Sequence, residues 1–162
     1  MPISNPRDKF VHELADMYDA EHQFLEAQQK MLDQATDDKL RKLLETHIEE
    51  TQQQISNLEQ VFEAAGEQPE RQTCSGAKGL IEEATKMMQE AGSDEMRDAF
   101  IVGAATKAEH YEMVGYADLI EGATMLKMKA AAVKLLTQNR EQEVRTARKL
   151  ERQAPRVAKL AA

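Results

Sequence analysis

Five glutamates and one histidine interrupt the apolar faces of four predicted helices. These residues are Glu21, His47, Glu50, Glu109, Glu112 and Glu143. Each lies near the middle of its helix, where an isolated buried carboxylate must lose its charge or find a cation. Because five carboxylates and one imidazole cannot all neutralise one another, the pattern predicts a site for two metal ions.

The spacing of these residues puts two pairs on shared helix faces. His47 and Glu50 are separated by one helical i, i+3 step, and so are Glu109 and Glu112. Each pair is therefore only about 60° apart around its helix. We expect both members of each pair to face the same centre.

The other three histidines of the chain are excluded from the predicted site. His22 and His110 each follow a candidate glutamate directly, so each points about 100° away from it. His12 lies roughly two and a half turns before Glu21 on the same predicted helix, which is too far to share a metal.

The predicted ligands are rich in oxygen and include no thiolate. Carboxylates combined with imidazole favour iron or manganese over a structural zinc ion, which prefers cysteine and histidine. We therefore expect two metal ions, with iron as the first choice and manganese as the alternative. Gln54 and Tyr116 lie one turn beyond Glu50 and Glu112, where they are placed to orient the carboxylates.

The surrounding sequence predicts an all-α protein that forms a single domain over residues 1–162. Frequent Ala, Glu, Lys, Leu and Gln favour helix, and the expected helices cover residues 6–34, 37–65, 77–91, 94–125 and 129–153. Asn5 and Pro6 form a helix-start signal for the first of them. Pro155 is expected to end the last helix and to leave a frayed tail at 155–162.

The order of the helices predicts an antiparallel four-helix bundle. Two long hairpins are joined by a crossover of about 28 residues that contains its own short helix. Glu21 and Glu50 lie about equally far from the first predicted turn, as Glu112 and Glu143 do from the second. The acids of all four long helices are therefore expected at one level.

Each candidate residue also has a simpler interpretation. A single glutamate on an apolar face is most often a rim position, and a lone histidine is most often a hydrogen-bonded core residue. Acids that form a hydrated polar layer without metal would give the same pattern. The agreement in level across four helices is what favours a metal site.

Charge and composition exclude several other classes of function. The net charge is −8, yet residues 127–162 hold 10 basic and 3 acidic residues. This basic segment suggests nucleic-acid binding as one alternative, but the pI of about 5.1 argues against it. The single Cys74 excludes an internal disulfide. With no signal peptide and no apolar run long enough for a membrane span, we expect a cytoplasmic protein.

Several short motifs together resemble a known family. They are Tyr18-Asp19-Ala20-Glu21, His47-Ile48-Glu49-Glu50-Thr51, Cys74 before Gly79-Leu80, Arg97-Asp98-Ala99, Glu109-His110-Tyr111-Glu112, Tyr116 and Glu143. Over residues 7–151 the chain resembles the ferritin-like superfamily, and in particular the bacterial YciE/YciF stress-protein family. The resemblance implies a ferritin-like bundle with a di-metal centre, most commonly di-iron, in a cytoplasmic protein of the stress response.

The chain departs from the wider ferritin-like pattern at two positions. Ferritin-like proteins usually carry Glu-x-x-His on the second and fourth long helices. Here the second helix has the reversed order His47-x-x-Glu50, and the fourth has Thr146 where the histidine would fall. We therefore expect an asymmetric centre in which one metal has fewer protein ligands.

The resemblance leaves more than one function open. The leading hypothesis is an oxidoreductase or ferroxidase that oxidises ferrous iron with dioxygen or peroxide. The alternative is a metal-binding, storage or structural stress protein without turnover, and the sequence does not decide whether the chain is an enzyme. We expect a homodimer, no nucleic-acid partner and no membrane association.

Overall fold

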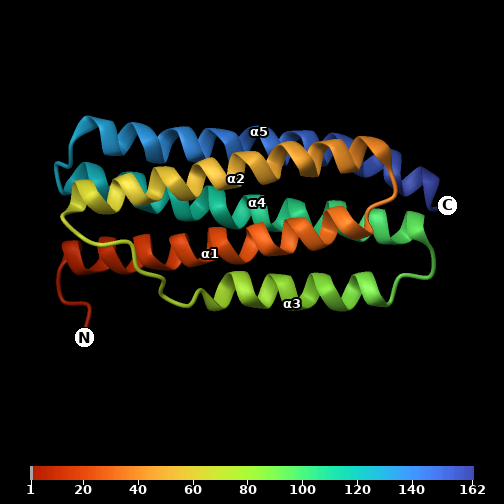
Figure 1. Cartoon of the computed structure of the whole chain (residues 1–162), viewed down its shortest axis with the longest axis horizontal. Helices are drawn as coiled ribbons and strands as arrows, with labels where there is room; N and C mark the ends of the chain where they lie inside the picture. The colour runs from red at the N-terminus through yellow and green to blue at the C-terminus, as the bar shows by residue number, and fades with distance from the viewer. Residues whose placement is uncertain (1) are drawn as a thin grey trace.

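The computed structural model describes residues 2–162, which form five α-helices and no strand. The helices are α1 (Pro6–Gln34), α2 (Asp38–Ala65), α3 (Ser75–Gln89), α4 (Asp94–Met125) and α5 (Ala130–Leu160). Figure 1 shows the four long helices running side by side, with the shorter α3 next to α1. Since α1 and α5 each contact both α2 and α4, the long helices form a closed ring. The predicted all-α bundle with a short extra helix in the crossover is confirmed.

The turn between α1 and α2 is fixed to α4 by one buried carboxylate. Asp98 accepts hydrogen bonds from the Thr36 backbone N–H at 2.9 Å, the Thr36 hydroxyl at 2.8 Å and the Asp37 N–H at 2.9 Å. Asp37 in turn caps α2 by accepting from the Leu40 N–H at 2.9 Å. These hydrogen bonds fix the position of the first hairpin (α1 and α2) along the bundle axis relative to α4 of the second hairpin. Asn5 caps α1 as predicted.

The predicted end of the last helix is wrong. Helix α5 continues through Pro155 to Leu160 instead of stopping there. A proline inside a helix costs roughly 3 kcal/mol, but tertiary contacts beyond it hold the helix. Val157 is buried in the core, and Arg156 forms an ion pair with Asp37 across the bundle. Helix α3 also begins two residues earlier than expected, because the Cys74 sulfur caps it.

The core is divided into two apolar clusters at opposite ends of the bundle. One contains Phe10 and Leu14 of α1 with Phe62 of α2, and the other contains Leu40 and Leu44 of α2. The buried acids occupy the middle of the same helices, between these clusters. A layer in this position is shielded from water at both ends. Among residues 2–162, no helix is long and apolar enough to cross a bilayer.

Candidate metal centre

The middle layer of the bundle buries five of the six predicted ligands. Relative exposure is 0% for Glu21, Glu112 and Glu143, 1% for Glu109 and 2% for His47. Each of the four long helices supplies at least one of them. The expected agreement in level across the bundle is therefore present in the structure.

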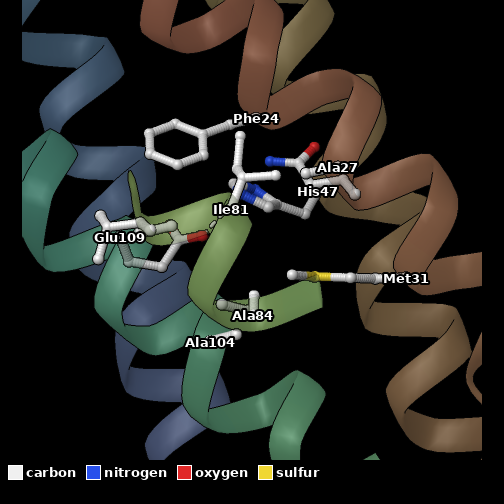
Figure 2. Close-up of a pocket in the computed structure, with 12 residues that line it drawn as sticks. Phe24, Ala27, Met31, His47, Ile81, Ala84, Ala104 and Glu109 are labelled. Carbon is white, nitrogen blue, oxygen red and sulfur yellow. Dashed lines mark ion pairs between the residues drawn. The ribbon is translucent and has the colours of Figure 1, made fainter. Parts of the chain in front are cut away.

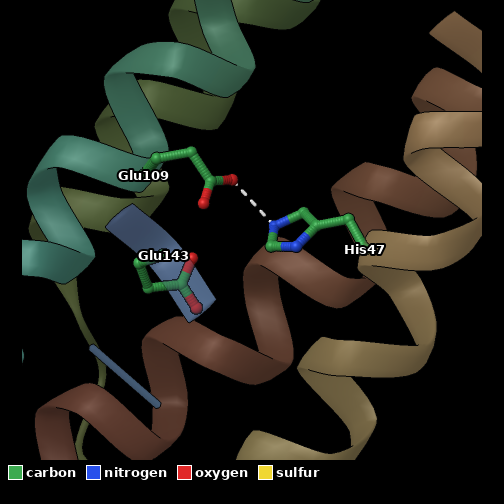
Figure 3. A group of neighbouring side chains, drawn as sticks. All are labelled: His47, Glu109 and Glu143. Carbon is green, nitrogen blue, oxygen red and sulfur yellow. Dashed lines mark ion pairs between the residues drawn. The ribbon is translucent and has the colours of Figure 1, made fainter. Parts of the chain in front are cut away.

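The first group of neighbouring ligands joins α2, α4 and α5. His47, Glu109 and Glu143 each offer one ligand atom, and these atoms lie within 4.8 Å of one another. Figure 3 shows the three side chains pointing toward a common space, with His47 and Glu109 as an ion pair. The His47 Nε2 atom lies 2.7 Å from Glu109 Oε1, although the pair is poorly aligned for a hydrogen bond.

The second group joins α1, α4 and α5. Glu21, Glu112 and Glu143 also offer ligand atoms within 4.8 Å of one another. Glu143 thus belongs to both groups. A carboxylate shared between two ligand sets is the arrangement by which helix bundles hold two metal ions a few ångströms apart.

Glu50 does not join either group. Its side chain is 22% exposed, and its Oε2 atom lies 3.7 Å from Nδ1 of His47. The hydroxyl of Thr146 donates to the same Oε2 at 3.3 Å. Glu50 therefore lies on the side of the imidazole opposite Glu109, too far from Nδ1 for a hydrogen bond.

Gln54 and Tyr116 contact the acids as the sequence predicted. The Gln54 amide donates a hydrogen bond to Glu143, and the Tyr116 hydroxyl donates one to Glu21. Sequence reasoning missed Asn139, which is fully buried and donates to the Tyr116 oxygen at 3.0 Å and to the Gln54 carbonyl at 3.2 Å. Asn139 lies one turn before Glu143 on α5, so its position on the inner face was a usable signal.

The excluded histidines lie away from the centre. His110 is exposed and forms an ion pair of 2.9 Å with Glu151. His22 packs edge-on against Tyr18, with ring centroids 4.7 Å apart. His12 is exposed on α1.

The electrostatics of the layer favour a bound cation. Burial raises the pKa of Glu21 to about 7, and burial together with neighbouring carboxylates raises the pKa of Glu112 and Glu143 well above the ordinary value. Burial lowers the pKa of His47, but the Glu109 carboxylate outweighs it and the net pKa rises to about 9. His47 and Glu109 form a charge pair, and burial disfavours the ionised form of the other three acids until a further cation, such as a metal ion, supplies positive charge.

Unpartnered buried atoms test whether the residues fit a metal. Within the described part of the chain, seven polar atoms of the layer have no hydrogen-bond partner: Glu21 Oε2, His47 Nδ1 and Nε2, Glu109 Oε2, both oxygens of Glu112, and Glu143 Oε2. Buried polar atoms are rarely left unpaired, and such a concentration calls for an ion or another ligand. The oxygen-rich donors with one imidazole fit iron or manganese.

The chain matches one protein family and is similar to individual members of known sequence and structure. A family described as "Domain of unknown function (DUF892)" matches residues 5–162. Protein YciF of Escherichia coli strain K12 is 37% identical over 151 residues, which cover 93% of this chain and 90% of that protein.

Three solved structures share the fold. YcfI from Rhodopseudomonas palustris, described as a candidate structural protein, is 39% identical with a TM-score of 0.89, over 92% of this chain and 94% of that one. The E. coli stress protein YciF is 35% identical with a TM-score of 0.90, over 96% and 98%. A protein from Xanthomonas campestris at 20% identity and a TM-score of 0.76, over 95% and 94%, shares the fold alone.

Proposed function

The chain belongs to the family described as "Domain of unknown function (DUF892)", that of the YciE/YciF-type stress proteins, and from this premise we propose a di-iron protein that oxidises ferrous iron. The observation that carries the proposal is the position of Glu143, which is shared by two groups of buried ligands. Tyr116, Gln54 and the His47–Glu109 pair satisfy only part of these groups, and five carboxylate oxygens of Glu21, Glu109, Glu112 and Glu143 have no hydrogen-bond donor among the described residues.

We assign the ligands of the two ions by group. His47, Glu109 and Glu143 would hold one ion, and Glu21, Glu112 and the same Glu143 would hold the other. The first site then has one imidazole and the second has carboxylates only. The two donor sets therefore differ, because His47 belongs to the first group alone.

Two ferrous ions would supply one electron each, so that dioxygen with two protons becomes hydrogen peroxide, or hydrogen peroxide with two protons becomes two waters. The residues around the site prepare it for this chemistry. Tyr116 fixes Glu21 and Gln54 fixes Glu143, so both carboxylates are held before an ion arrives. Burial raises the pKa of Glu112 and Glu143, which favours the protonated carboxyl groups in the metal-free protein, and a bound cation would favour their ionised form.

Counting bound ions tests the assignment. We expect about two ferrous ions per chain after anaerobic loading, as a dinuclear carboxylate site requires. Glu143→Gln removes the shared ligand and should lose both ions, whereas Glu21→Gln should keep about one. Glu151→Gln is the matched control, because Glu151 lies on the same helix α5 but is exposed. If Glu143→Gln binds iron like the parent chain, the proposed centre is wrong.

Exposure of the loaded protein to dioxygen or to peroxide tests turnover. A ferric absorbance that appears faster than in free ferrous solution supports oxidation at the site. The alternative is metal binding without turnover, which the description of the R. palustris relative as a candidate structural protein favours. Bound ions that stay ferrous in the presence of both oxidants would select that alternative.

A further inference from the structure

A small cavity lies beside the proposed metal centre, between α1, α3 and α4 (Figure 2). Its volume of about 20 Å³ is enough for one small molecule. The cavity wall contains five alanines: Ala27, Ala84, Ala104, Ala105 and Ala108. Their short side chains leave this space where larger side chains would fill it.

The cavity ends at the metal centre. His47 and Glu109, two ligands of the first proposed ion, form part of its wall. Figure 2 shows both side chains facing the same space as Ile81 and Ala84 of α3. A molecule in the cavity would therefore lie in contact with the ligands of that ion. Helix α3 covers the outer side, which gives this extra helix a role beyond connecting the two hairpins.

One unpartnered polar group also belongs to the cavity wall. Gln28 is 6% exposed, and its Oε1 atom has no hydrogen-bond partner among residues 2–162. Once His47 and Glu109 hold an ion, the remaining wall side chains are apolar apart from Gln28. A buried water is normally held by two to four polar partners. Hydrogen peroxide has two O–H donors, and it would likewise find too few hydrogen-bond acceptors in this cavity wall.

We propose that this cavity binds dioxygen and delivers it to the metal centre. The proposal rests on the proposed function and narrows it, because an apolar diatomic molecule fits an apolar space of this size better than peroxide does. Two ferrous ions held by His47, Glu109 and the other proposed ligands would supply one electron each, and dioxygen with two protons from water would become hydrogen peroxide. The alanine side chains give the cavity its apolar wall, and α3 closes its outer side. Together they would favour dioxygen over peroxide as the oxidant that reaches the ions.

Dioxygen binding can be measured on the full-length protein loaded with Zn²⁺, which is diamagnetic, occupies the ligands His47 and Glu109, and does not react with dioxygen. Dissolved dioxygen is paramagnetic and speeds the relaxation of nearby ¹³C-labelled alanine methyl groups. We expect a larger effect at Ala84 and Ala105 than at Ala123 and Ala132, which are equally buried but lie outside the cavity. Equal effects at all four alanines would overturn the proposal. Because zinc has no redox chemistry, this result does not depend on the proposed iron oxidation.

Filling the cavity tests delivery to the centre. Ala84→Val adds two methyl groups from α3, and Thr85→Val at the next, exposed position is the control. We expect Ala84→Val to lose the dioxygen effect at Ala105 and to slow iron oxidation by dioxygen about tenfold, a barrier change of about 1.4 kcal/mol. Oxidation by peroxide and the number of ferrous ions bound should stay unchanged.

The outcomes separate the two proposals. If dioxygen and peroxide oxidation are slowed equally, or neither is slowed, the cavity is not the dioxygen path. If the parent chain binds no iron, the proposed function fails, while the methyl relaxation result still decides whether dioxygen occupies the cavity. Should Ala84→Val fail to fold, Ala104→Val fills the same cavity from α4 at a partly exposed position that tolerates added volume better.

Discussion

Replacing Glu21 by glutamine should stabilise the metal-free protein above pH 7 and weaken its metal binding. Glu21 is fully buried, and burial raises the pKa of its carboxyl from 4.5 to about 7. A pKa raised in the folded state gives stability that is fully present below about pH 4.5 and is lost as the pH rises through 7. Glutamine has the same shape, still accepts the hydrogen bond from Tyr116, and never carries the charge.

The size of the effect follows from the two pKa values. The difference between 4.5 and about 7, at roughly 1.4 kcal/mol per unit, sets an upper bound of about 3 to 4 kcal/mol. Glu112 ionises more readily once Glu21 is neutral, so part of this gain is offset. We expect Glu21→Gln to raise the free energy of unfolding by about 1–3 kcal/mol at pH 8. Each kcal/mol corresponds to a rise of roughly 2–4 °C in Tm for a chain of this size. At pH 4.5 the two proteins should be about equally stable, because both are neutral at this position.

Urea unfolding followed by circular dichroism, with a chelator present, measures this difference at pH 4.5, 6 and 8. Glu151→Gln, which removes an exposed acid, is the control and should change little at any pH. Adding ferrous or manganous ion should stabilise the parent chain, by about 2.7 kcal/mol at a hundredfold excess over Kd, and stabilise Glu21→Gln less. A variant that is less stable than the parent at pH 8, or equally stabilised by metal, would refute the reasoning.

Three further predictions concern contacts outside the ligand groups. Arg156→Ala should lower stability by about 1–2 kcal/mol near neutral pH, because the Arg156 hydrogen bond lowers the pKa of Asp37 to about 2. The difference from the parent should shrink as the pH falls from 4 toward 2, and urea unfolding at pH 6 and pH 3 checks this sign. Asn139→Leu removes the donor that fixes Tyr116 and should weaken metal affinity about 10–100-fold, measured by competition with a chromophoric chelator, while the helix content stays the same. Pro155→Ala restores a helical N–H inside α5 and should raise stability by about 1–2 kcal/mol, whereas an unchanged Tm would mean that the helix end is held by its tertiary contacts alone.

The fold was largely predictable because the helices carry strong local signals. Asn5 marks the start of the first helix in the sequence and caps α1 in the structure, and the predicted end at residue 65 is the end of α2. Pro155 misled the prediction because local propensity was weighed without the contacts of Arg156 and Val157, which join α5 to the rest of the bundle. Those contacts depend on residues more than a hundred positions away, so no local pattern could indicate them.

The candidate site was predictable to the level of the helix face, but not to the atom. The helical period correctly brought Glu109 and Glu112 inward together. The same period put Glu50 beside His47, yet a separation of about 60° is enough to turn Glu50 toward the half-exposed edge of the layer. The partners expected from the sequence, Gln54 and Tyr116, lie one turn after a predicted ligand, whereas Asn139 lies one turn before Glu143 and was therefore missed.

The buried acids also fix the register of the bundle. The apolar clusters on either side consist largely of Leu, Ala and Met, which tolerate shifts that conserve volume. A shift of α1 by one turn against α4 would instead separate Glu21 from Tyr116 and leave a carboxylate unpaired in an apolar environment, at a cost of several kcal/mol. Asp98 of α4 accepts hydrogen bonds from the α1–α2 turn, and these hydrogen bonds oppose the same shift. The polar layer therefore lowers the stability of the metal-free protein but selects a single register, and that register is the one in which Glu143 lies between the two ligand groups.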